Sequence, residues 1–95
     1  MTELEITGQN KNQYIQNGIL TIEKAETITK LCCNNMNISS IDLSNFVNLV
    51  FLDCSNNNIS SINLSNCVNL EVLYCNNNNI SSIDVSNCVN IYRVY

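Results

Sequence analysis

Residues 49–69 read LVFLDCSNNNISSINLSNCVN, and this stretch decides the fold of the chain. It recurs almost letter for letter at residues 70–90 as LEVLYCNNNNISSIDVSNCVN, and with more changes at residues 28–48 as ITKLCCNNMNISSIDLSNFVN. A fixed period of 21 residues predicts a repeat architecture before any local propensity is considered. Ile91 and Val94 keep the same register, so a fourth unit begins at residue 91.

The apolar residues recur in fixed columns, and these columns explain why the period exists. They are Ile28/Leu49/Leu70/Ile91, Leu31/Leu52/Leu73/Val94, Cys33/Cys54/Cys75, Ile38/Ile59/Ile80, Ile41/Ile62/Ile83, Leu43/Leu64/Val85, Phe46/Cys67/Cys88 and Val47/Val68/Val89. One unit by itself cannot bury these side chains, whereas stacked units turn each column into a continuous inner ladder. The sequence therefore predicts a solenoid with these columns inside.

Apolar-x-apolar triplets recur through the chain with the period of two that a β-strand requires. They lie at residues 20–22, 31–33, 41–43, 52–54, 62–64, 73–75 and 83–85. Each unit should therefore carry two short strands on opposite walls of a flattened coil, and successive coils should stack as parallel sheets with strands ~4.8 Å apart. Runs of Asn and Ser interrupt every apolar stretch, so we expect little or no helix.

The unit resembles the leucine-rich repeat pattern L-x-x-L-x-L-x-x-N-x-L, with Cys in the third apolar place and Asn57 and Asn78 in the Asn place. The continuation I-x-x-I-D/N-L/V is similar to the nested 21-residue subclass called IRREKO, which is known from bacterial, protist and large-virus proteins. The resemblance implies a leucine-rich-repeat solenoid whose first-strand sheet contacts other proteins. It covers residues 28–95, divided into 28–48, 49–69, 70–90 and a partial unit 91–95.

Residues 1–27 depart from the repeat and are expected to form an N-terminal cap. Leu4 and Ile6 alternate with polar residues and predict an edge strand. Residues 8–12 are rich in turn formers, and residues 13–15 would return as the second strand of a hairpin-like cap. Such a hairpin would cover the open end of the first coil, as the terminal units of solenoids must.

The repeat register is expected to begin before residue 28. Leu20, Ile22 and Ala25 are apolar and lie one 21-residue period before three members of the inner columns. We therefore expect a degenerate half-unit at the end of the cap. A single helical turn within residues 22–30 is the alternative interpretation.

Charge and composition exclude several classes of function. The 95 residues carry a net charge of −4, only 13% are charged, and there is no His, Trp or Pro. No basic surface exists that would release counterions from a phosphate backbone, so we expect no nucleic acid partner. No apolar run approaches the ~18 residues of a membrane span, and the N-terminus lacks the features of a signal peptide. We therefore expect no membrane partner and a cytoplasmic location (host cytoplasm if the chain is viral).

Six cysteines in a short chain would suggest a disulfide framework, but their positions argue for free thiols. Five of them stand in the inner columns, where free Cys serves as a small buried hydrophobic residue. In-register parallel strands rarely offer the Cβ geometry of a disulfide. A metal site is not expected, because there is no His and no C-x-x-C. Only Cys32 faces outward, as a candidate reactive thiol.

Asn is the other excess, at 20 positions. Asn57 and Asn78 are expected in the turn that leaves the first strand, where the side-chain amide satisfies backbone groups of its own coil and of the next one. Met36 stands in the same place of the first full unit, so the turn beside the cap should be built differently. Pairs of Ser form a polar row, at 39–40, 60–61 and 81–82.

Catalysis and cofactor binding find no support in the residues. No His is available as a general base, and there is no Gly-rich phosphate loop and no G-x-S-x-G. Asp42 and Asp84 lie two coils apart with Asn63 between them, too far to act on one bond as a carboxylate pair. We therefore expect no catalytic residues, no cofactor and no metal.

The outward positions of the first strand in each unit predict the binding surface. They are Lys30, Cys32, Phe51, Asp53, Val72, Tyr74, Arg93 and Tyr95. The aromatic and aliphatic members adjoin in a row with few charges, and a soluble monomer seldom exposes such a patch. We therefore predict a non-catalytic protein–protein interaction module whose binding residues are Phe51, Asp53, Val72, Tyr74, Arg93 and Tyr95.

A homodimer is the expected assembly, and the sequence does not identify any other protein partner. The last strand, with Tyr92, Val94 and Tyr95, would present an apolar edge that pairs antiparallel with a second copy. The rival interface is the face of Phe51, Val72 and Tyr74.

An alternative class of function stays open. The regular Ser and Asn rows predict an ordered-surface binder of ice or glycan, although few Thr residues stand in those rows. Tyr74→Ala separates the two classes, because it should abolish protein capture and leave an ordered-surface binder intact.

Overall fold

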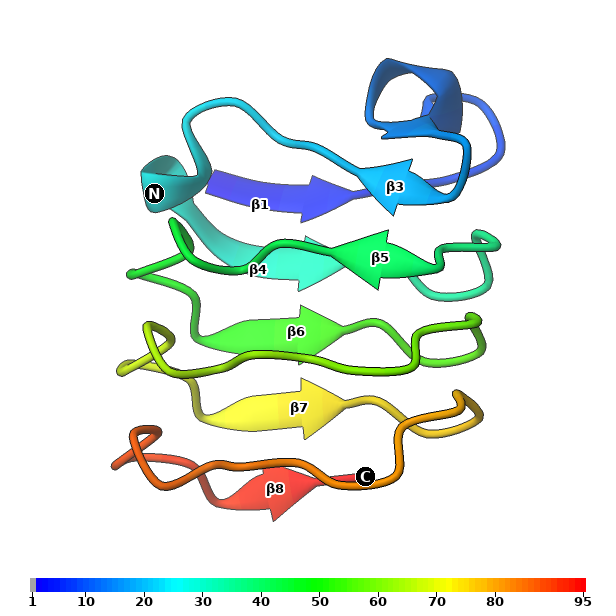
Figure 1. Cartoon of the computed structure of the whole chain (residues 1–95). Helices are drawn as coiled ribbons and strands as arrows, with labels where there is room; N and C mark the ends of the chain where they lie inside the picture. Colours follow the sequence, from blue (N-terminus) through cyan, green and yellow to red (C-terminus); the bar gives the residue numbers. More distant parts are fainter. Residues whose placement is uncertain (1) are drawn as a thin grey trace.

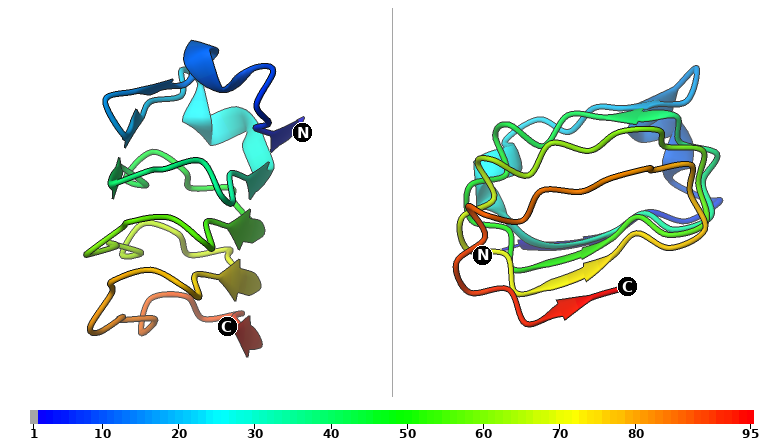
Figure 2. Two further views of the ribbon diagram at one scale, coloured as in Figure 1. Left: turned by 90° about the vertical axis from the view of Figure 1, so that its right-hand side faces the viewer. Right: turned by 60° about the horizontal axis from the view of Figure 1, so that its bottom comes forward.

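In the computed structural model, which describes residues 2–95, the chain winds into a stack of flattened coils (Figure 1). Each coil contributes one strand to a five-stranded parallel sheet with the order β1–β4–β6–β7–β8. These strands are β1 (Thr2–Glu5), β4 (Ile28–Cys32), β6 (Phe51–Asp53), β7 (Val72–Tyr74) and β8 (Arg93–Val94). Seen obliquely along the stack, they lie on one wall of a flattened outline, and the returning chain forms the opposite wall (Figure 2).

The predicted solenoid with little helix is confirmed. In the part of the chain that the structure describes, helix is limited to two short 3₁₀ turns, η1 (Lys11–Gln13) and η2 (Ala25–Thr27). The second of these lies within residues 22–30, where one helical turn is the alternative interpretation of the sequence.

Each strand of the main sheet pairs with its counterpart one repeat away. Leu31, Leu52, Leu73 and Val94 are direct cross-strand partners. The three leucines are fully buried, whereas Val94 in the last strand is 46% exposed. The inner ladder that the 21-residue period predicts is therefore confirmed.

The second wall carries a smaller sheet than expected. It consists of β2 (Ile15–Gln16), β3 (Ile19–Leu20) and β5 (Ser40–Ile41), and β3 pairs with β5 in parallel. The expectation of a second strand in every coil is wrong for residues 62–64 and 83–85, which form no strand. The side chains of Asp42, Asn63 and Asp84 accept backbone N–H groups two residues later in all three coils, so these local bonds do not explain the difference. At β5 the partner strand β3 is already held in place by β2.

The N-terminal cap differs from the predicted hairpin. β1 does lie at the sheet edge, but it pairs in parallel with β4 and not with residues 13–15. The hairpin is instead β2–β3, joined by Asn17 and Gly18, whose φ angles are 54° and 76°. Two-residue Asn-Gly loops favour such a turn, because it needs positive φ at both positions. Leu20 pairs with Ile41, its counterpart one 21-residue period later.

The core follows the predicted columns with one clear exception. Val47, Val68 and Val89 are 39%, 44% and 78% exposed, so their assignment to an inner column is wrong. Each follows a buried residue inside a pair of tight turns. In the first full coil, the Phe46 N–H donates to the Leu43 oxygen (3.1 Å) and the Leu49 N–H to the Phe46 oxygen (3.3 Å). Consecutive side chains of such a turn cannot both face the core, and here the Phe or Cys does.

Candidate protein-binding face

Alternation along the strands puts one outward row on each side of the buried leucine ladder. The first row consists of the cross-strand partners Lys30, Phe51, Val72 and Arg93. The second row consists of Cys32, Asp53 and Tyr74, and Tyr95 follows Val94 at its end. The structure therefore brings together on one face the residues that the sequence predicts to bind protein, namely Phe51, Asp53, Val72, Tyr74, Arg93 and Tyr95.

Strand β1 adds two acidic residues that sequence reasoning missed. Glu3 is the cross-strand partner of Lys30, and Glu5 is the partner of Cys32. Both glutamate side chains are exposed. Residues 2–5 show no match to the repeat, so nothing in the periodicity indicates that they join this sheet. The sheet face therefore has acidic residues at its β1 edge and Arg93 at its β8 edge.

Three aromatic side chains form a continuous row across the last strands. The ring centroids of Phe51 and Tyr74 are 5.6 Å apart, with the planes tilted by 45°. Tyr74 and Tyr95 stack nearly parallel, at 4.5 Å and 8°. Tyr74 therefore contacts two rings, and the Tyr95 ring is stacked on one of its faces. We call Phe51, Val72, Tyr74 and Tyr95 the aromatic face.

The charged side chains of this sheet are only partly available to a partner. The Lys30 Nζ lies 5.0 Å from the centroid of the Phe51 ring, within the range of a cation–π contact. Asp53 Oδ1 accepts the N–H and the hydroxyl of Ser55, at 3.1 and 2.6 Å. Arg93 lies 6.0 Å from the Tyr92 ring and remains exposed. Asp53 is thus held by its own turn, whereas Arg93 is free to reach another molecule.

The residues predicted for a dimer edge lie at the last strand. Tyr92, Val94 and Tyr95 are 67%, 46% and 50% exposed. The backbone of Tyr95 is bonded to Leu73 and Cys75 of the neighbouring coil (2.9 and 3.0 Å). Among the described residues, the outer edge of β8 has no strand partner.

Asn57 bonds to the coil before its own, and not to the next one as expected. Its Oδ1 accepts the N–H groups of Met36 and Ile38 (3.0 and 2.9 Å). Its Nδ2 donates to the carbonyl oxygens of Cys33, Cys54 and Ser55 (3.1, 2.9 and 3.1 Å). Asn78 repeats the arrangement one coil later. The prediction that these two Asn side chains satisfy backbone groups is confirmed, with the direction along the stack reversed.

This direction explains why Met36 is tolerated in the Asn place. An Asn there would have to serve a turn of the N-terminal cap, where the chain follows a different path. The hydrogen bond between the first full coil and the cap comes instead from Gly18, whose carbonyl oxygen accepts the N–H of Ser39 (2.7 Å). Asn37 has a positive φ of 58°, which its counterparts Asn58 and Asn79 lack. The expected difference in this turn is therefore confirmed.

The six cysteines are free thiols, and most of them are buried. Burial raises the pKa of the Cys54 thiol to about 12 and that of Cys67 to about 11. Burial also raises the pKa of Cys32, despite the lowering effect of nearby Lys30. Cys32 therefore stays protonated at neutral pH, which disfavours the reactive thiol expected there.

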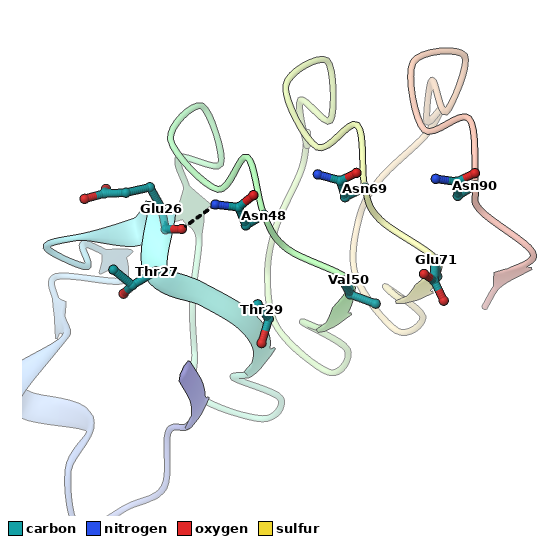
Figure 3. Close-up of a pocket in the computed structure, with 8 residues that line it drawn as sticks. All are labelled: Glu26, Thr27, Thr29, Asn48, Val50, Asn69, Glu71 and Asn90. Atoms are coloured by element: carbon teal, nitrogen blue, oxygen red, sulfur yellow. Dashed lines mark hydrogen bonds between the residues drawn. The ribbon is translucent and has the colours of Figure 1, made fainter. Parts of the chain in front are cut away.

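A groove of about 540 Å³ runs along the rim where the strands of the main sheet begin (Figure 3). One Asn from each full coil lines it, namely Asn48, Asn69 and Asn90. The Asn48 amide donates to the Glu26 carbonyl oxygen (2.7 Å), and the Asn69 amide donates to the Val47 carbonyl oxygen (3.0 Å). These bonds tie two of the coils to the coil before them, so stacking accounts for Asn48 and Asn69.

Within residues 2–95, no group of three or more His, Cys, Asp or Glu side chains is arranged to hold a metal ion. In the same residues, no helix is long and apolar enough to cross a bilayer.

Comparison with known proteins agrees with this geometry. Residues 47–88 match the family model described as Leucine Rich repeats (2 copies). A search of curated proteins found no match. Among solved structures, the functional domain of InlJ from Listeria monocytogenes, described as including a cysteine ladder, is similar with a TM-score of 0.76 and 28% identity. That alignment covers 79% of this chain and 17% of the InlJ chain, so this chain spans a small part of that protein's length.

The fold and these matches define a solenoid of the leucine-rich-repeat type. It is a β-solenoid with parallel strands on its main wall and almost no helix in the described residues. Proteins built from such repeats generally mediate protein–protein interactions, and they are typically non-enzymatic scaffolds.

Proposed function

We propose that this chain is a non-catalytic protein–protein interaction module that binds its partner through the aromatic face. The observation that carries the proposal is the continuous aromatic row, in which Tyr74 contacts Phe51 at 5.6 Å and Tyr95 at 4.5 Å. Soluble proteins rarely leave a continuous apolar patch uncovered. Aromatic side chains also supply much of the binding energy at protein interfaces.

The aromatic face is preorganised for binding. Tyr74 contacts two aromatic rings, and its backbone oxygen accepts the N–H of Cys54 in the main sheet (2.8 Å). A side chain that is already ordered loses little conformational entropy when a partner arrives. Flat ligands such as nucleobases stack on ring faces, and one face of Tyr74 is already stacked on Tyr95. This favours a protein surface as the partner.

A non-catalytic role is supported by the way the acidic residues are used. Hydrogen bonds from the backbone and hydroxyl of Ser44 hold the pKa of Asp42 below its usual value. The hydroxyl and backbone of Ser86 lower the pKa of Asp84 in the same way. Both carboxylates are thus held by turns of their own coils, and the chain has no His to serve as a general base.

The finer classification is also a proposal. We assign the units to the nested subclass IRREKO, because Asp42, Asn63 and Asp84 form the same side-chain turn in each of them. The column of Cys33, Cys54 and Cys75 is this chain's counterpart of the cysteine ladder by which the InlJ structure is described.

Pairing through the last strand is a second candidate, favoured by the exposure of Tyr92 and Val94 beside the outer edge of β8 (67% and 46%). The N–H and C=O groups of an edge strand pair readily with another strand. A second copy of this chain would supply that strand. Light scattering tests this with wild type and a Val94→Lys/Tyr95→Lys variant. A wild-type mass near 10.7 kDa at micromolar concentration contradicts this edge-paired dimer, and a variant that stays dimeric excludes this edge.

The proposed protein binding is tested by photo-crosslinking. The photoreactive residue benzoylphenylalanine replaces Val72 on the aromatic face, and a matched variant carries it at Asn63 on the opposite wall. After irradiation in an extract of the source cells, we expect protein adducts from position 72 and none from position 63. The adducts at position 72 should disappear with Phe51→Ala/Tyr74→Ala. Equal adducts at both positions, or adducts that survive this double change, contradict the proposal.

The ordered-surface binder of ice or glycan stays an untested prediction. So do the cytoplasmic location and the expected absence of nucleic acid and membrane partners. Tyr74→Ala should leave binding to an ordered surface unchanged, which separates that class from the proposed function.

A further inference from the structure

Charges are arranged with opposite signs at the two edges of the main sheet. Glu3 and Glu5 project from β1 at one edge, and Arg93 projects from β8 at the other. The middle of this face carries Lys30, which lies against Phe51, and Asp53, which is bonded to Ser55. A face with opposite charges at its two ends can pair with a reversed copy of itself.

We propose that the aromatic face binds a second copy of this chain, packed face to face about a two-fold axis that runs parallel to the strands over β6. This inference rests on the proposed function, because it names the partner of the same surface. Such an axis reverses the order of the strands and keeps the positions along each strand. β1 of one copy then faces β8 of the other, and β4 faces β7.

The outer contacts of this dimer are complementary. The first outward row, extended by Glu3 on β1, faces the same row of the second copy in reverse order. Glu3 of one copy therefore meets Arg93 of the other. In the other row, the Glu5 carboxylate meets the Tyr95 hydroxyl. Two-fold symmetry makes each contact occur twice. Complementary charges of this kind set the orientation of two surfaces more than the strength of binding.

The other in-plane two-fold axis, along the stack, fails on charge. It keeps the strand order and exchanges the two rows, so β1 would lie on β1. Glu3 would face Glu5 of the second copy, and four carboxylates would gather at one edge. Juxtaposed like charges suppress such an arrangement. The signs of the edge residues therefore select the axis parallel to the strands.

The centre of the dimer contains one favourable and one unfavourable contact. Phe51 meets Phe51 of the second copy, which buries the apolar middle of the face. Asp53 meets Asp53, and these two carboxylates repel each other. Replacing Asp53 by Asn removes the repulsion and keeps an Oδ1 to accept the bonds from Ser55. Asp53→Asn should therefore tighten the dimer, which no edge-to-edge pairing predicts.

The size of the face limits the affinity. Five strands ~4.8 Å apart, each with two outward residues, present roughly 300 Å² per copy. Stable interfaces bury about 800 Å² per partner, so this dimer is weak and depends on concentration. The measurement must therefore extend from micromolar to millimolar protein.

Sedimentation equilibrium of the purified chain, at low and at high salt, tests the inference. We expect self-association that weakens with salt, because the edge charges are exposed. Glu3→Arg and Arg93→Glu should each weaken it about tenfold, since each turns two attractions into repulsions. The double variant Glu3→Arg/Arg93→Glu should restore it. Glu23→Arg, which changes an exposed acid away from the sheet face, is the matched control and should leave it within about twofold.

Circular dichroism of each variant shows whether the fold is kept. The inference is overturned if Glu3→Arg and Arg93→Glu leave the association unchanged, or if the double variant does not recover it. It is also overturned if Asp53→Asn weakens the dimer. A chain that is monomeric at every concentration also overturns it. That last result leaves the proposed function to its own crosslinking test, so the two fail separately.

Discussion

The side chain of Asn57 completes the turn that contains Ile38, one coil earlier, by accepting the Ile38 N–H at 2.9 Å. Asn57 is only 7% exposed and takes part in five such bonds, so it links the backbones of two coils at a buried point. Stacking in this protein thus depends on side-chain amides as well as on apolar ladders.

Asn57→Ala should be strongly destabilising, because it leaves buried N–H and C=O groups of two coils without partners. One buried unsatisfied group costs about 1–3 kcal/mol, so we expect a loss of ~3 kcal/mol or more in the free energy of unfolding. Urea denaturation measures it. Asn58→Ala is the matched control, since Asn58 is exposed and makes one side-chain bond at 3.3 Å, to Asn37. A loss below ~1 kcal/mol for Asn57→Ala would refute the role of the amide.

Leu73→Ala should open a cavity in the middle of the leucine ladder. Leu73 is 0% exposed, and truncation of such a residue costs ~2–5 kcal/mol. Since small domains are stable by only ~5–15 kcal/mol, the melting temperature should fall steeply. Val89→Ala is the control, because Val89 is 78% exposed and should change stability by less than ~0.5 kcal/mol. Similar shifts for both variants would contradict the assignment of inner and outer positions.

Gly18→Ala tests the hairpin of the N-terminal cap. Gly18 has a φ of +76°, and a Cβ there would lie 2.7 Å from the Ser39 Oγ. Backbone strain together with this contact should cost ~1–3 kcal/mol in thermal or urea unfolding. Gly8→Ala is the control, since a Cβ at Gly8 meets nothing within 4 Å. Equal stability of the two variants would show that the Asn17–Gly18 turn is not formed.

Alkaline pH should destabilise the protein through its buried thiols. Burial raises the pKa of Cys54 to about 12 and of Cys67 to about 11, whereas an unfolded cysteine titrates near ~8.5. Above that pH the unfolded chain loses protons that the folded chain keeps. The stability from these thiols is fully present below about pH 8.5. It is lost as the pH rises towards the pKa values of the thiols in the folded protein, by up to ~1.4 kcal/mol per pH unit for each thiol.

Urea denaturation between about pH 8 and 10.5 checks this prediction, with a shallower slope expected for Cys54→Ala/Cys67→Ala. Val68→Ala removes no thiol and should keep the wild-type slope. If the double cysteine variant loses stability with pH as steeply as wild type, the thiols are not responsible.

The candidate face was largely predictable, because its residues obey the same period as the core. Phe51 and Asp53 flank Leu52, and Val72 and Tyr74 flank Leu73, so strand alternation alone turns them outward. The stacking of Tyr74 on Tyr95 needs the cross-strand register, which the period also supplies. Glu3 and Glu5 could not be predicted as members of this face, because β1 joins the sheet without matching the repeat.

The sequence by itself determined the coiled architecture, the number of residues in each coil and the inner leucine ladder, because equivalent positions of a repeat must lie in line when coils stack. Only the tertiary structure decided the rest. It placed β1 beside β4, turned the Val47 column outward, and directed the Asn57 amide to the preceding coil. Each of these depends on competition between neighbouring backbone groups for hydrogen bonds, and a one-dimensional period does not contain that competition.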